Sequence, residues 1–123
     1  MSYVCKWFKP AEFACRCGCG FGANAGDVDV GLLKVLDDVR EHFGKPVSVV
    51  SGCRCKKHNT KVGGAKGSKH MLRIAADIKV RGVEPIEVYG YLTEKYPKTF
   101  GIGLYKTWVH VDVRSNRARW DET

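Results

Sequence analysis

The pattern of apolar and polar residues predicts a domain that mixes helices with short strands. Apolar side chains recur at helical spacing between positions 32 and 43, which predicts a helix over residues 30–43. Asp27 or Asp29 can cap its first turn, and Gly44 is placed to end it. Trp-Val-His-Val-Asp-Val near the end of the chain alternates every second residue, which is typical of a strand with one apolar face.

The rest of the chain divides at its glycine and proline residues. The pattern predicts a helical turn at 10–13, a strand at 46–50, a polar loop over 54–69, a strand at 75–80, a helix over about 84–95, and a hairpin of 101–105 with 108–113. Together these elements predict one α+β domain covering residues 1–123. We expect a small antiparallel sheet with helices on one face and a shallow cleft on the other.

Three residues of the types that bind zinc fall in or beside the predicted strands. They are His70, Asp77 and His110. His70 and Asp77 are seven residues apart, so they suit a loop and the strand that follows it rather than one helical face. A catalytic zinc has three protein ligands and leaves a fourth position open. These three side chains are therefore candidate ligands of one catalytic zinc ion.

Several blocks of the chain resemble the zinc D-Ala-D-Ala carboxypeptidases, peptidase family M15. The likeness rests on Ser-x-His-x(6)-Asp at 68–77 and His-x-Asp-Val-Arg at 110–114, with further blocks at 51–55, 58–59, 62–65 and 101–105. It is strongest for the small single-domain members of phages and prophages. One departure is Arg73, where relatives usually carry glycine, and a bulky cation there is expected to narrow the cleft or to alter substrate preference.

The resemblance implies a zinc peptidase that cuts peptidoglycan stem peptides or cross-links. It implies an endolysin-type endopeptidase or a D,D-carboxypeptidase, on a fold shared with hedgehog-type signalling domains. Because those domains keep a zinc site while acting as binding modules, a non-catalytic module for cell-wall peptides is the alternative.

Other polar residues supplement the three ligands. Arg54 occupies the arginine position of the family's Ser-Gly-x-Arg block, where a guanidinium binds substrate or stabilises charge on the attacked carbonyl. Its other interpretation is a surface salt bridge. Ser68 either binds the substrate backbone or caps the turn before His70. Asp112 shares a strand face with His110, and is either the catalytic base or a partner that holds a ligand in place.

Composition adds limits on partners and location. The net charge of +8 favours polyanions, of which an anionic cell wall fits better than nucleic acid because the basic residues are scattered. We expect a monomer with no nucleic-acid partner and no membrane insertion. The first ten residues lack the apolar core of a secretory signal, so we expect synthesis in the host cytoplasm and action on the wall after release.

The six cysteines leave three possibilities open. Free, partly buried thiols are the favoured interpretation. Pairing of Cys15, Cys17 or Cys19 with Cys53 or Cys55 would require an oxidising compartment. A second, structural zinc on the thiolates is disfavoured because Cys-x-Cys differs from the usual Cys-x(2)-Cys spacing.

Overall fold

A computed structural model describes residues 6–23 and 26–123 and shows a five-stranded sheet covered by helices. The elements in chain order are the 3-10 turn η1 (Pro10–Phe13), α1 (Val30–Phe43), β1 (Val47–Ser51), α2 (Lys56–Lys61), β2 (Ala75–Val80), α3 (Pro85–Lys95), β3 (Gly101–Leu104), β4 (Val109–Asp112) and β5 (Ala118–Asp121). The strand order is β1-β2-β4-β3-β5. All neighbouring pairs are antiparallel except β3 and β5, which run parallel. The predicted α+β fold is confirmed.

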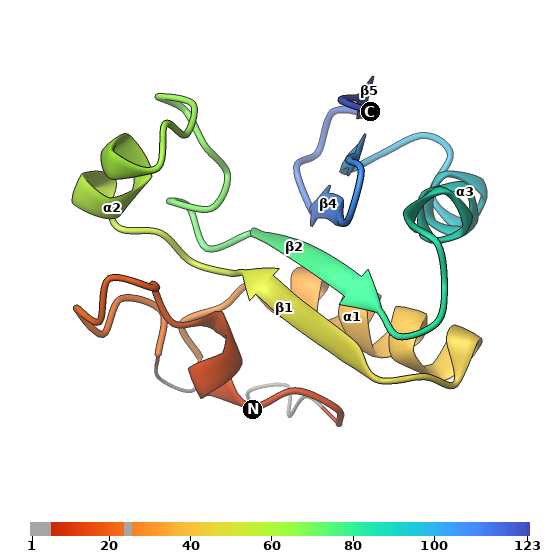
Figure 1. Cartoon of the computed structure of the whole chain (residues 1–123), viewed down its shortest axis with the longest axis horizontal. Helices are drawn as coiled ribbons and strands as arrows, with labels where there is room; N and C mark the ends of the chain where they lie inside the picture. The colour runs from red at the N-terminus through yellow and green to blue at the C-terminus, as the bar shows by residue number, and fades with distance from the viewer. Residues whose placement is uncertain (1–5, 24–25) are drawn as a thin grey trace.

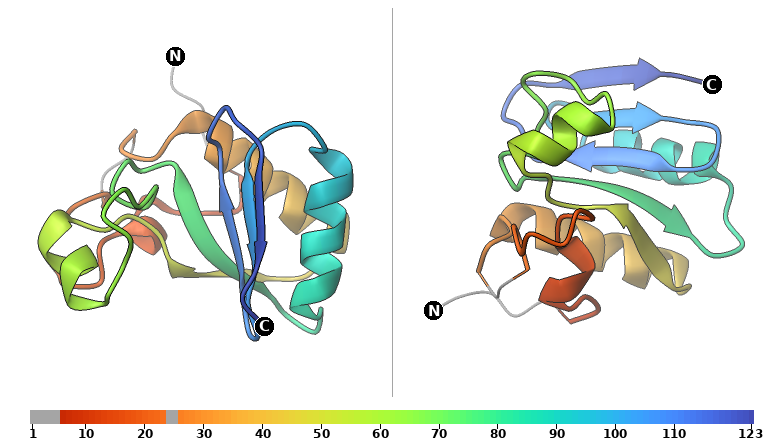
Figure 2. Two further views of the ribbon diagram at one scale, coloured as in Figure 1. Left: turned by 90° about the horizontal axis from the view of Figure 1, so that it is seen from above. Right: turned by 60° about the vertical axis from the view of Figure 1, so that its left-hand side comes forward.

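The long helices α1 and α3 cover one face of the sheet, whereas α2 and its loop lie toward the other (Figures 1 and 2). Strand residues alternate between these faces. On β2, Ala76, Ile78 and Val80 join the hydrophobic core with the apolar residues of α1 and α3. Asp77 belongs to the opposite set of positions. The sheet therefore separates an apolar core from a polar face on which a site can form.

Local signals explain the ends of the two long helices. The carboxylate of Asp29, rather than Asp27, accepts a hydrogen bond from the Gly31 amide and caps α1. Gly44 ends the helix in the left-handed conformation with a φ of 63°. Helix α3 begins with Pro85 in its first turn, after a capping box between Glu84 and Glu87.

Two elements depart from the sequence prediction. The region 54–69 is not wholly loop, because it contains α2, whose first turn is capped by the Cys55 sulfur accepting from the His58 amide. The strand β5 was not predicted, and it extends the sheet beyond β3. Both elements border the polar face.

Among the described residues, no helix combines the length and the apolar character that crossing a membrane requires.

Candidate active site

The three predicted ligands meet on the polar face of the sheet. Asp77 on β2 and His110 on β4 are direct cross-strand partners. His70 comes from the loop that leads into β2. One potential ligand atom from each lies within 4.8 Å of the others, and the residues are only 3–7% exposed. The structure thus brings together all three residues that the sequence singled out, as a group able to hold a metal ion.

Both histidine rings are fixed by hydrogen bonds on the side away from the shared carboxylate. His70 Nδ1 lies 2.6 Å from the Gly52 carbonyl oxygen, and its Nε2 lies 3.4 Å from Asp77 Oδ1. His110 Nδ1 lies 3.1 Å from the same Asp77 oxygen, while its Nε2 lies 2.8 Å from Asp112 Oδ2. A carbonyl or carboxylate behind a histidine is the usual partner of a metal ligand, because it orients the ring and raises its basicity.

Charge in this group favours a cation. Burial alone would raise the pKa of Asp77, but hydrogen bonds from His110 and His70 hold it well below its ordinary value. Burial alone would lower the pKa of His110, yet the carboxylates of Asp112 and Asp77 raise it. Two imidazoles and one ionised carboxylate are a donor set that zinc accepts. These residues therefore fit the metal that the resemblance implies.

A cleft of about 610 Å³ opens over the three residues. Its floor contains His70, Asp77 and His110. Its walls are formed by the following residues: Arg54, Val62, Gly63, Gly64, Ala65, Gly67, Ser68, Lys69, Tyr105, Trp108, Arg114 and Trp120. Within the described chain, no carboxylate or imidazole lines this cleft except the three candidate ligands.

Arg54 enters the cleft beside Asp77. Its Nη2 lies 3.5 Å from Asp77 Oδ2, and its Nε donates to Ser51 Oγ at 3.2 Å. Its Nη1 donates to Oδ1 of Asn59, and Nδ2 of Asn59 donates to the Ala65 carbonyl. The predicted alternative of a surface salt bridge does not describe this residue, since its side chain is 15% exposed and faces the site.

Asn59 is a supporting residue to which the sequence analysis gave no role, although block 58–59 belongs to the family resemblance. It is buried on α2, and it links the guanidinium of Arg54 to the glycine-rich loop. Asn59 lies in a polar segment, where no regular spacing of apolar residues indicates a helix or a buried position. The close approach of Gly64 to the Asn59 side chain explains why a residue without a Cβ stands there.

Asp112 lies behind His110 rather than in the cleft. It is fully buried, and its oxygens receive hydrogen bonds from the Gly101 amide, the His110 ring and the Arg114 guanidinium. Burial would raise its pKa, but the bonds from His110 and Arg114 lower it well below the ordinary value. Of the two roles considered for Asp112, this geometry favours holding His110 in place over accepting a proton from the cleft.

Ser68 has the contact expected of a turn cap, and it borders the cleft. Its Oγ accepts a hydrogen bond from the His70 amide at 3.2 Å, so it caps the turn that delivers this ligand. The residue also lines the cleft.

The expectation that Arg73 narrows the cleft is wrong. Arg73 adopts a left-handed φ of 62°, which glycine adopts at lower cost and which agrees with the glycine of relatives. Its guanidinium lies over the Phe21 ring at 5.2 Å, and it lines a separate hollow formed with residues 26–30.

Aromatic residues complete the wall nearest β4. Tyr105 stacks on Trp108 with ring centroids 4.8 Å apart. Trp120 on β5 donates from its indole to the Tyr105 hydroxyl at 2.9 Å, and its ring lies 5.0 Å from that of His110. Trp120 was missed because β5 itself was not predicted.

Comparison with known proteins agrees with this geometry. No curated protein matches the chain. A family model described as Peptidase M15 matches residues 6–112, a span that contains all three candidate ligands and Arg54. Because the match covers most of the sequence, the chain belongs to the peptidase M15 family.

Proposed function

We propose that this M15 peptidase is a zinc-dependent enzyme that hydrolyses peptide bonds in the stem peptides or cross-links of bacterial peptidoglycan. The observation that carries the proposal is the convergence of His70, Asp77 and His110 on the floor of an open cleft of about 610 Å³. Three protein ligands below an open cleft are the arrangement of a catalytic zinc site, whereas a structural site has four and is closed.

The residues of this site have distinct roles in the proposal. His70, Asp77 and His110 would hold the zinc, which when bound lowers the pKa of a water molecule and polarises a carbonyl. Arg54 offers a planar set of donors beside Asp77 and binds the substrate's carbonyl oxygen or a carboxylate. Asp112 keeps the His110 ring oriented through its Nε2.

The charge and shape of the cleft support a peptide that carries carboxylates. Arg54, Lys69 and Arg114 bring positive charge to its walls, and Tyr105 and Trp108 supply a flat apolar surface. Ser68 borders the same space and is placed to bond a peptide backbone. Stem peptides of peptidoglycan offer free carboxylates and small side chains, which suits this lining.

The proposal extends to the biological setting. We place the protein among endolysin-type enzymes of phages, acting as a monomer that is made in the host cytoplasm and reaches the wall after release. Its net charge of +8 supports attraction to a wall that carries anionic polymers.

Digestion of purified peptidoglycan by the zinc-loaded protein tests the reaction, with mass analysis of the released peptides. We expect soluble fragments with new amino termini from an endopeptidase, or free D-alanine alone from a carboxypeptidase. His70→Ala should abolish release, and His42→Ala, which alters an exposed histidine on α1, should leave it unchanged. Zinc-loaded protein that binds the wall yet releases nothing at any pH would instead indicate a non-catalytic binding module.

A further inference from the structure

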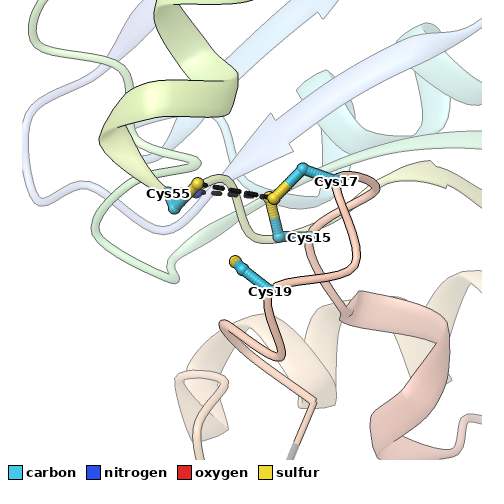
Figure 3. A group of neighbouring side chains, drawn as sticks. All are labelled: Cys15, Cys17, Cys19 and Cys55. Atoms are coloured by element: carbon cyan, nitrogen blue, oxygen red, sulfur yellow. Dashed lines mark hydrogen bonds between the residues drawn. The ribbon is translucent and has the colours of Figure 1, made fainter.

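Four cysteine sulfurs converge on the side of the molecule where the N-terminal loop meets α2 (Figure 3). Cys15, Cys17 and Cys19 lie in the loop after η1, and Cys55 is the residue that caps α2. All four Sγ atoms lie within 4.8 Å of one another. The buried Cys53 is not part of this group, and Cys5 lies outside the described residues.

The sulfur spacing matches a metal site. The Sγ atoms of Cys15 and Cys17 are 3.5 Å apart, those of Cys17 and Cys55 are 3.7 Å apart, and those of Cys15 and Cys55 are 3.8 Å apart. A tetrahedron with zinc–sulfur bonds of about 2.3 Å has edges of about 3.8 Å. A disulfide would require about 2.05 Å. The described cysteines are unpaired, and the spacing of Cys15, Cys17 and Cys55 is that of three ligands around one ion, with Cys19 Sγ within 4.8 Å as the fourth.

The backbone explains how so short a loop supplies three sulfurs. Gly18 and Gly20 have φ values of 82° and 87°, a conformation that lets the chain reverse direction twice within the loop. The Gly18 amide donates to the Cys15 carbonyl at 3.2 Å and closes the first turn. The spacing that argued against a metal in the sequence is therefore compensated by these two turns.

Backbone amides are already directed at two of the sulfurs. The Cys55 amide donates to Cys15 Sγ at 3.4 Å, and the His58 amide donates to Cys55 Sγ at 3.4 Å. Hydrogen bonds of this kind stabilise thiolates that bind a metal.

We propose that Cys15, Cys17, Cys19 and Cys55 bind a second zinc ion, separate from the site of His70, Asp77 and His110. Four sulfur ligands leave no open position, so this zinc is structural. It ties the N-terminal loop to a segment 40 residues away in the chain. Arg54 directly precedes Cys55 and enters the cleft. The zinc bound by Cys55 and the three loop cysteines therefore also fixes the position of the Arg54 guanidinium.

Metal content measured by mass spectrometry tests the assignment. We expect two zinc ions per wild-type chain, and one in either the Cys17→Ser/Cys19→Ser double variant or His70→Ala. Cys17 and Cys19 are exposed, so their replacement leaves the core intact. Cys53→Ala is the matched control because it removes a cysteine outside the cluster, and it should keep two ions. A folded double variant with two zinc ions, or iron in place of zinc, would overturn the proposal.

Two further measurements test the site independently of metal counting. With cobalt in place of zinc, sulfur-to-metal charge-transfer absorption should persist in His70→Ala and vanish in the double variant. Titrating wild-type thiols with a mercurial should release one zinc to a chromogenic chelator as the cluster reacts. Modification that releases no zinc, or disulfides among the four cysteines in unreduced denatured protein, would refute the site even if the double variant failed to fold.

Discussion

The fully buried carboxylate of Asp112 accepts a hydrogen bond at 2.8 Å from Nε2 of His110, on the ring edge opposite the candidate metal site. Arg114 binds both oxygens of the same carboxylate, at 2.8 Å and 2.7 Å. Because both of its oxygens are bound in this way, Asp112 does not reach the cleft. It instead orients the His110 ring.

Asp112→Asn should lower the affinity of the catalytic site for zinc and should not impair proton transfer directly. Loss of a carboxylate behind a ligating histidine lowers metal affinity by about 10–100-fold. Competition with a chelator of known affinity measures this, together with the pH profile of peptidoglycan cleavage. We expect saturating zinc to restore most activity without moving the pH profile. Unchanged zinc affinity with activity lost at every zinc concentration would make Asp112 the proton acceptor instead.

Arg54→Lys should reduce catalysis while leaving zinc bound. Lysine keeps the positive charge beside Asp77 but loses the planar donors that reach Ser51 and Asn59. Removing a donor of this kind costs about 10²-fold in rate, which we expect in kcat/KM on a stem-peptide substrate. Arg81→Lys, at an exposed turn after β2, is the matched control and should leave kcat/KM unchanged. If Arg54→Lys and Arg81→Lys had equal kcat/KM values, Arg54 would have only a structural role.

The candidate ligands and the long helices could be singled out from the sequence because their signals are local. The helix Val30–Phe43 follows from apolar spacing and a terminal glycine, and the alternation in β4 places His110 opposite the core. That alternation also puts Asp112 on the face of His110. It does not reveal which ring nitrogen points at Asp112, and this orientation decides the residue's role.

The missed features depend on contacts between distant parts of the chain. Helix α2 is Lys-Lys-His-Asn-Thr-Lys, which has no apolar face, and it starts where the Cys55 sulfur accepts a backbone hydrogen bond. Strand β5 pairs in parallel with β3 and places Trp120 over the glycine face of that strand. The Cys-x-Cys spacing argued against the sulfur cluster, and its fourth member, Cys55, lies 40 positions from Cys15, a distance across which sequence spacing shows no contact.

Cleavage of whole cell wall should be more sensitive to salt than cleavage of a small soluble peptide. The net charge of +8 attracts an anionic wall over long range, and salt screens this attraction within about 10 Å at 0.1 M ionic strength. Rates on purified wall and on a synthetic stem peptide, measured over the same salt series, test the difference. If salt lowered the cleavage rates of both substrates equally, it would act on the cleft and not on the attraction to the wall.

Gly103→Ala should impair the cleft through Trp120. A methyl group at Gly103 would overlap the Trp120 indole, which lies beside His110 and donates to Tyr105. Overpacking of this kind costs about 1–3 kcal/mol, so the free energy of unfolding should fall and KM for a stem peptide should rise as the indole moves. Gly90→Ala is the matched control, because its site on α3 is exposed and open, and it should stabilise the protein by about 0.4–1 kcal/mol without altering KM. Denaturant unfolding and steady-state kinetics on both variants measure the two effects. A Gly103→Ala variant with wild-type KM would show that the position of Trp120 does not govern substrate binding.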